Sequence, residues 1–174
     1  GSGKTLCSLK FALERAIISK KKRIIYVIPY NSIIDQTAQV FQNIFKEYAL
    51  VLRHQSTFSF ENLNSNNEEE PLFLKQATEN WDAKIIITTA VQFFESLYSN
   101  KRQKLRKLHN MADSIIIFDE AHLMPKDFLQ PCLQAITHIT EFLNSQAVFL
   151  TATMPDFRWL LKEFSSEKIV IEDL

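Results

Sequence analysis

The sequence predicts an α/β protein in which a mostly parallel sheet is covered by helices on both faces. Short runs that are apolar at every position, such as residues 24–28, 85–87 and 115–118, alternate with longer segments whose apolar residues recur at helical spacing. A strand without polar positions is buried on both faces, which is typical of a parallel sheet between two helical layers. No apolar run approaches the ~20 residues that span a membrane, so no membrane association is expected.

The first third of the chain contains two predicted helices and two predicted strands. Residues 5–20 are apolar at helical spacing and end in a basic run, which suits a helix C-terminus. The strand at 24–28 follows and stops before a proline. Asn31 is a favourable N-cap for a second helix that runs to about residue 48, and residues 50–52 are a candidate strand.

The alternation continues after a polar stretch at residues 56–70, which is rich in asparagine and glutamate and predicts a surface loop or insertion. We expect further helices at 71–81, 90–98, 127–143 and 155–164, strands at 85–87, 114–118, 147–150 and 169–171, and a basic connector at 101–107.

The composition fits one globular domain in a reducing compartment. The chain of 174 residues carries 20 basic and 20 acidic side chains, so bulk charge does not hold it on nucleic acid. Its two cysteines are too few for a disulfide framework, and a cytoplasmic location is expected. The four histidines have no metal-ligand spacing.

The only two glycines of the chain, Gly1 and Gly3, flank Ser2 directly before Lys4 and Thr5. Average usage would place about twelve glycines in this length. The pattern matches the second half of a phosphate-binding loop, whose backbone N–H groups surround the phosphates of ATP while the lysine pairs with them. The threonine hydroxyl of such a loop binds Mg²⁺. We therefore expect ATP and Mg²⁺ as cofactors, held by these five residues, with Lys4 catalytic and Thr5 a metal ligand.

The first glycine of such a loop and the strand before it would lie upstream of residue 1. We therefore expect a fragment of a longer protein, which by itself hydrolyses ATP poorly. A Gly-Ser cloning remnant is the alternative for the first two residues.

An acidic pair, Asp119 and Glu120, follows the apolar strand at 114–118. At the carboxyl end of a parallel strand, such a pair is the second half of a nucleoside triphosphatase site. Asp119 would hold Mg²⁺, and Glu120 would orient or deprotonate the attacking water. The alternative is an acidic first turn of a helix, which the helix dipole favours.

A third motif, Thr151-Ala152-Thr153, follows the strand at 147–150. Alone it is also explained by a turn or a helix cap. The order of the three motifs, however, resembles the first RecA-like domain of the superfamily-2 helicases of the DEAD/DEAH-box type. This resemblance implies a three-layer RecA-like P-loop domain over residues 1–174. It also implies that His122 and Thr151 to Thr153 couple hydrolysis to movement on nucleic acid.

Residues 25–36, 88–97 and 106–110 are similar to the CRISPR-associated helicase, or helicase-nuclease, of type I interference systems. The resemblance implies an ATP-dependent DNA helicase that unwinds and helps degrade invading DNA. It implies single-stranded DNA and a CRISPR surveillance complex as partners. It also implies a second RecA-like domain and an HD nuclease domain outside this chain.

Four residues match the nucleic-acid motifs of that family by position: Pro29, Tyr30, Thr88 and Thr89. Contacts of this kind reach the sugar-phosphate backbone and position a strand without reading its sequence. Tyr30 stands where many helicases have threonine, so stacking on a base is a second role for it. A helix cap is the alternative for the two threonines.

Two other functions are consistent with the sequence. One is another superfamily-2 motor, such as a restriction translocase or an RNA helicase. The other is a nucleotide-binding remnant without motor activity. The stripe of Phe93, Phe94 and Leu97 is expected in the core rather than as a platform for bases, and the basic run at 101–107 is expected on a solvated face.

Overall fold

Five parallel strands lie at the centre of the computed structural model, which describes residues 2–45, 51–54, 80–98, 102–124 and 126–151. Their order across the sheet is β2-β3-β1-β4-β5, and every neighbouring pair is parallel. The strands are β1 (Arg23–Ile28), β2 (Val51–His54), β3 (Ile85–Thr89), β4 (Ser114–Phe118) and β5 (Gln146–Phe149). The sheet confirms the predicted α/β class.

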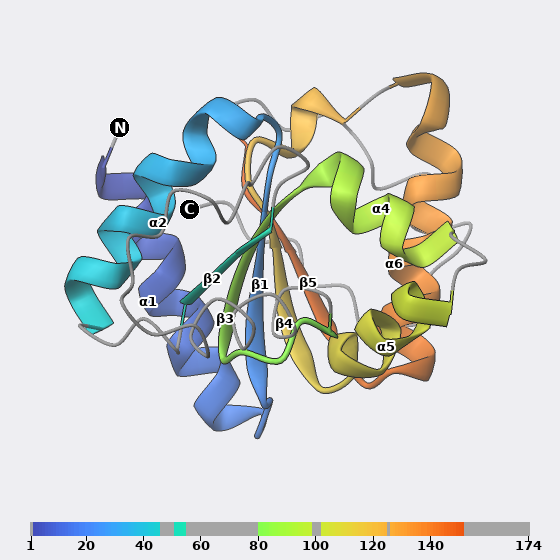
Figure 1. Cartoon of the computed structure of the whole chain (residues 1–174), viewed down its shortest axis with the longest axis horizontal. Coiled ribbons are helices and arrows are strands. Elements are labelled where there is room, and N and C mark those ends of the chain that lie inside the picture. Colours follow the sequence, from blue (N-terminus) through green and yellow to red (C-terminus); the bar gives the residue numbers. More distant parts are fainter. Residues whose placement is uncertain (1, 46–50, 55–79, 99–101, 125, 152–174) are drawn as a thin grey trace, which may run out of the picture.

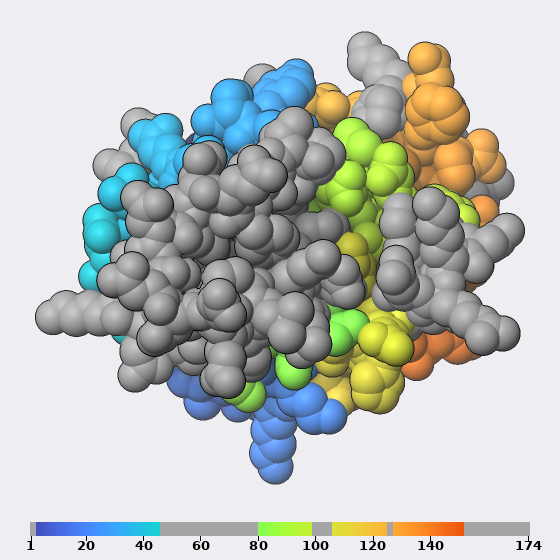
Figure 2. Space-filling model, viewed as in Figure 1, coloured from blue at the N-terminus to red at the C-terminus, as the bar shows by residue number. Residues whose placement is uncertain are grey.

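Helices cover both faces of this sheet (Figure 1). One layer contains α1 (Ser2–Ile18) and α2 (Asn31–Phe45). The other contains α4 (Ala90–Tyr98), α5 (Arg102–Met111) and α6 (Leu129–Phe142). Figure 2 shows α4 and α6 at the surface of this second layer, where Oη of Tyr98 donates to the carbonyl of Pro131 at 2.6 Å. None of the described helices is both long and apolar enough to cross a bilayer.

The strands alternate their side chains between two apolar clusters, one under each helical layer. In β1, Ile24, Tyr26 and Ile28 face α1 and α2, whereas Ile25 and Val27 face the opposite layer. Both sets are buried, which explains why the strand has no polar face in the sequence.

The predicted connector at 101–107 is wrong, because residues 102–111 form helix α5. The charged residues of this segment are interspersed with apolar residues that form one side of the helix. Leu108 and Met111 pack against the core cluster, and Lys107 is only 6% exposed, with its Nζ 5.5 Å from the centre of the Trp81 ring. A lysine stem can cover apolar surface in this way while its charge stays beside an aromatic face.

The other differences are small. The helix predicted at 127–143 is divided into a 3₁₀ turn, η4 (Lys126–Phe128), and α6, and β3 extends through both threonines at its end. The predicted loop at 56–70, the helix at 155–164, the strand at 169–171 and almost all of the helix at 71–81 lie outside the described residues.

Because all five strands are parallel, their carboxyl ends meet at one edge of the sheet. Three backbone hydrogen bonds hold the end of β4 between its neighbours. N–H of Asp119 donates to the carbonyl of Val27 at 2.8 Å, N–H of Leu150 to that of Phe118 at 2.9 Å, and N–H of Ala121 to that of Leu150 at 2.9 Å. The acidic pair is therefore fixed between β1 and β5.

Candidate nucleotide-binding site

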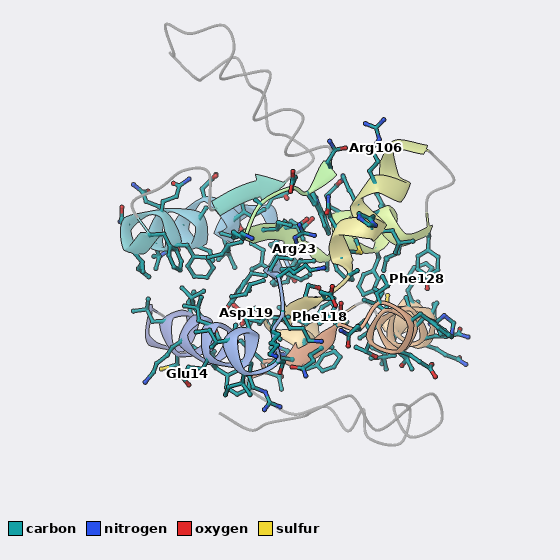
Figure 3. The ribbon with its side chains drawn as sticks, turned by 90° about the horizontal axis from the view of Figure 1, so that it is seen from below. Glu14, Arg23, Arg106, Phe118, Asp119 and Phe128 are labelled. Carbon is teal, nitrogen blue, oxygen red and sulfur yellow. The ribbon has the colours of Figure 1, made fainter. Side chains whose placement is uncertain are left out.

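The first turn of α1 and the turn after β4 meet at this carboxyl edge. Nζ of Lys4 donates to Oε1 of Glu120 at 3.2 Å. Figure 3 shows the neighbouring Asp119 at the sheet, between the helical layers. A cavity of about 610 Å³ opens beside these groups, a size typical of small-molecule sites. Its lining consists of Gly3, Lys4, Thr5, Ile28, Pro29, Ile33, Gln36, Thr37, Val40, Asp119 and Glu120.

Gly3 has open space where a side chain would be. A Cβ built on this residue would meet no atom within 4 Å, and its φ is not positive. Its backbone conformation and its packing thus permit other residues, so neither explains the glycine. A phosphate approaching the amino end of the 17-residue helix α1 would use this space. Ser2 is the first residue of that helix, and Gly1 lies outside the described residues.

Asp119 is held through both carboxylate oxygens. Its Oδ1 accepts the N–H of Glu120 at 3.0 Å, and its Oδ2 accepts the hydroxyl of Tyr26 at 3.3 Å. Burial, followed by the negative charge of Glu120, raises the pKa of Asp119, while these hydrogen bonds and the charge of Lys4 oppose the shift. A cation bound beside the carboxylate would offset both causes of the increase.

Glu120 has a left-handed backbone conformation, with φ 48° and ψ 48°. This conformation costs a non-glycine residue on the order of 1–3 kcal/mol and persists only where its surroundings enforce it. Here the hydrogen bonds that flank the residue enforce it. Its Oε2 is buried and accepts no hydrogen bond from the described residues, although Nδ1 of His122 lies 3.4 Å away. A water would satisfy this acceptor, which fits the predicted water-orienting role.

His122 connects Glu120 to the third motif. Its Nδ1 lies 3.4 Å from Oε2 of Glu120 and 3.1 Å from Oγ1 of Thr151. The imidazole therefore stands between the acidic pair after β4 and the threonine after β5. Ala152 and Thr153 lie outside the described residues.

The predicted nucleic-acid residues divide into two groups. Pro29 lines the cavity, and Tyr30 beside it is 55% exposed. Thr88 is instead fully buried, so in this conformation its side chain does not reach the surface. Thr89 is also buried and its Oγ1 accepts the N–H of Gln92 at 3.3 Å, which is the geometry of the helix-cap alternative.

Residue-by-residue reasoning missed Tyr26 and Ser8. Both are buried, and Oη of Tyr26 lies 2.9 Å from Oγ of Ser8 and 3.3 Å from Asp119. Burial and the nearby Asp119 charge raise the pKa of Tyr26, so the phenol keeps its proton. The sequence does contain one signal: Tyr26 carries the only polar side-chain group among residues 24–28, which are otherwise isoleucine and valine. A buried hydroxyl needs a hydrogen-bond partner, so its presence there indicates one nearby.

Residues 1–159 match the family model described as DEAD/DEAH box helicase. The chain belongs to this helicase family. It is 30% identical, over an alignment 175 positions long, to the CRISPR-associated nuclease/helicase Cas3 of Haloferax volcanii. That alignment covers 89% of this chain but only 18% of the relative, so the chain spans less than a fifth of that protein.

Two solved helicases have the same fold as this DEAD/DEAH-box chain. The crystal structure of the DUF1998 helicase MrfA bound to DNA and AMPPNP matches with a TM-score of 0.66 and 16% identity, over 99% of this chain and 23% of that one. A hypothetical ATP-dependent RNA helicase from Sulfolobus tokodaii matches with a TM-score of 0.61 and 19% identity, over 99% of this chain and 45% of that one. The RecA-like fold is thereby confirmed, and the chain is a helicase ATP-binding domain of the superfamily-2 type.

Proposed function

We propose that this domain binds and hydrolyses ATP within a CRISPR-associated DNA helicase, and that it drives movement along single-stranded DNA. The observation that carries the ATP site is the contact of Lys4 with Glu120 at the cavity that Thr5 and Asp119 also line. The 30% identity to the Haloferax volcanii protein supports the CRISPR assignment. Residues 1–174 would form one ATP-binding domain of a larger cytoplasmic protein.

Lys4 has two positions in this proposal. In one, its ammonium group donates to Oε1 of Glu120 at 3.2 Å. Because it is 46% exposed, it can leave this ion pair at modest cost and turn toward the β- and γ-phosphates. That movement frees the Glu120 carboxylate to accept a hydrogen bond from the attacking water.

The residues also fit a magnesium ion, which supplies charge neutralisation at the phosphates when bound. Asp119 is held in one orientation, and Thr5, which carries a hydroxyl group, lines the same cavity. One carboxylate and one hydroxyl suit Mg²⁺, which usually keeps several waters and phosphate oxygens as its other ligands. Among the described residues no group of three or more His, Cys, Asp or Glu forms a metal cluster.

The contact from Glu120 through His122 to Thr151 supports a coupling role for these residues. A change in the hydrogen bonding of Glu120 during hydrolysis would alter which neighbour His122 Nδ1 faces, and so would reach the segment after β5. Ala152 and Thr153 are proposed to continue this path. Pro29, Tyr30, Thr88 and Thr89 are proposed to contact the DNA strand, the two threonines after a rearrangement, because both are buried at the end of β3.

We expect the ATPase activity of the intact protein to rise with single-stranded DNA and to respond much less to RNA of the same sequence. Phosphate contacts dominate such binding, so both measurements need the same salt concentration. Greater stimulation by RNA would instead identify an RNA motor of the same superfamily. Hydrolysis that responds to neither nucleic acid would favour a nucleotide-binding module without motor activity. The surveillance complex, the second RecA-like domain and the HD nuclease domain remain proposed partners.

Lys4→Ala in the intact protein should weaken binding of a fluorescent ATP analogue by roughly 10–100-fold, because it removes a charge-assisted hydrogen bond to the phosphates. Lys10→Ala is the matched control, since Lys10 lies on the same helix with a 78% exposed side chain. Equal affinities of Lys4→Ala and the wild type in equilibrium titration would contradict the assignment of this loop.

A further inference from the structure

Tyr26 occupies an unusual place for a hydroxyl group. Its side chain is fully buried in the middle of β1, and its ring packs edge-on against Phe41, with centroids 5.4 Å apart and planes at 86°. The hydroxyl nevertheless lies 3.3 Å from Oδ2 of Asp119, a residue that lines the cavity. The same aromatic packing would be available to phenylalanine, so the packing alone does not explain the hydroxyl.

Ser8 holds this hydroxyl from the other side. Oγ of Ser8 is 2.9 Å from Oη of Tyr26, and it also lies 2.9 Å from the carbonyl oxygen of Thr5, to which it can donate. The Thr5 side chain also hydrogen-bonds the Tyr26 hydroxyl, which therefore has Ser8, Thr5 and Asp119 as neighbours. When Ser8 donates to Thr5, its oxygen remains available only as an acceptor. The Tyr26 proton is then directed to Ser8 or Asp119, and the carboxylate is the stronger acceptor of the two.

The two hydrogen bonds on Asp119 together restrict its rotation. The Glu120 N–H occupies Oδ1 and the Tyr26 hydroxyl occupies Oδ2, one on each oxygen. A carboxylate has about four lone-pair positions, so further acceptor positions remain for a metal-bound water or a cation. Loss of either donor would let the carboxylate turn, and a magnesium ligand that turns binds more weakly.

We propose that Tyr26 is a positioning residue for Asp119: its hydroxyl orients the carboxylate for Mg²⁺ bound with the nucleotide. The inference rests on the proposed function, because it assumes that Asp119 is the magnesium ligand. It adds a residue from the strand β1, which contributes no charged group to the cavity.

The test is the Mg²⁺ dependence of binding of a fluorescent ATP analogue to the intact protein. Tyr26→Phe removes the hydroxyl and keeps the ring against Phe41. The Mg²⁺ concentration at half-maximal binding is expected to rise about 10-fold, the scale seen for metal-orienting partners. Binding in EDTA should not change. Tyr98→Phe is the matched control, because it removes another tyrosine hydroxyl, the one that donates to the carbonyl of Pro131.

Ser8→Ala distinguishes the effect of the Ser8 hydroxyl from that of the Tyr26 hydroxyl. It leaves the bond from Tyr26 to Asp119 in place, so the half-maximal Mg²⁺ concentration should move roughly threefold or less. Ser96→Ala is its control, since Ser96 is also buried and donates within its helix, to the carbonyl of Gln92 at 2.6 Å. If Tyr26→Phe folds poorly, Tyr26→Phe combined with Ser8→Ala removes both partners of the contact between the two hydroxyls, and it should show the same 10-fold change.

An unchanged Mg²⁺ midpoint in folded Tyr26→Phe and in the double variant would overturn the inference. So would an equal loss of binding with Mg²⁺ and in EDTA, because that pattern indicates a purely structural role. Failure of the proposed function looks different. In that case the wild type shows no Mg²⁺-dependent nucleotide binding, or Asp119→Asn leaves the Mg²⁺ dependence intact.

Discussion

Glu120→Gln in the intact protein is expected to retain ATP binding and to lose ATP turnover by roughly 10²–10⁴-fold, the usual contribution of a positioned general base. The amide keeps the size of the side chain and an oxygen that can accept from Lys4. It lacks the negative charge that would orient or deprotonate a water at Oε2, a buried oxygen that accepts no hydrogen bond from the described residues. Single-turnover hydrolysis and equilibrium binding, measured on the same preparation, separate the two effects.

Glu141→Gln provides the control, because Glu141 is an exposed glutamate near the end of α6. Its turnover should equal that of the wild type. Near-wild-type hydrolysis by Glu120→Gln would show that another group activates the water. A parallel loss of binding would show instead that the ion pair with Lys4 at 3.2 Å supports the loop rather than the reaction.

The positions of Asp119 and Glu120 were predictable because two rules of the parallel sheet place them, and Lys4 was predictable from the phosphate-loop motif at the start of α1. Strands that are apolar throughout must lie between helical layers, and polar residues that follow such strands gather at one edge. The structure brings Lys4 and Glu120, 116 positions apart in the chain, into contact at that edge. The motif residues and the ends of the strands were enough to predict that these side chains lie together.

Tyr26 and Lys107 were not predictable by the same rules. Each has a polar group at the end of a long apolar or aromatic stem, and the surroundings decide where the polar end lies. For Lys107 the deciding neighbour is Trp81, 26 positions away in the chain, and for Tyr26 it is Asp119, 93 positions away. Periodicity describes only neighbours within a few positions, so it gives the face of a residue but not such distant contacts.

The left-handed conformation of Glu120 was also beyond sequence reasoning. Glutamate has no preference for positive φ, unlike glycine or asparagine. The conformation follows from the hydrogen bonds that fix the two residues beside it, Asp119 to β1 and Ala121 to the end of β5. It is therefore a product of the assembled sheet, and it turns the side chain toward Lys4.

Phe93→Ala is expected to reduce the free energy of unfolding by about 3–5 kcal/mol, as large-to-small changes at buried aromatic residues usually do. Phe93 is fully buried on α4, and its ring centroid lies 5.3 Å from those of Phe94 and Phe118 and 6.2 Å from that of Trp81. The fall in Tm should be roughly 6–20 °C for a domain of this size. Phe93→Leu should give a smaller decrease, because it leaves a smaller cavity.

Phe93→Ala also tests whether the Phe93 ring belongs to the core or serves as a platform for bases. Val91→Ala on the same helix changes a side chain that is 62% exposed, and its Tm should stay near that of the wild type. A base platform would instead lose about 1–3 kcal/mol of single-stranded DNA binding with Phe93→Ala while the Tm stayed constant. Since Phe118 directly precedes Asp119, a packing role also predicts that the folded fraction of Phe93→Ala binds nucleotide less tightly. Thermal unfolding and nucleotide titration of Phe93→Ala, Phe93→Leu and Val91→Ala therefore test the core and its support of the site together.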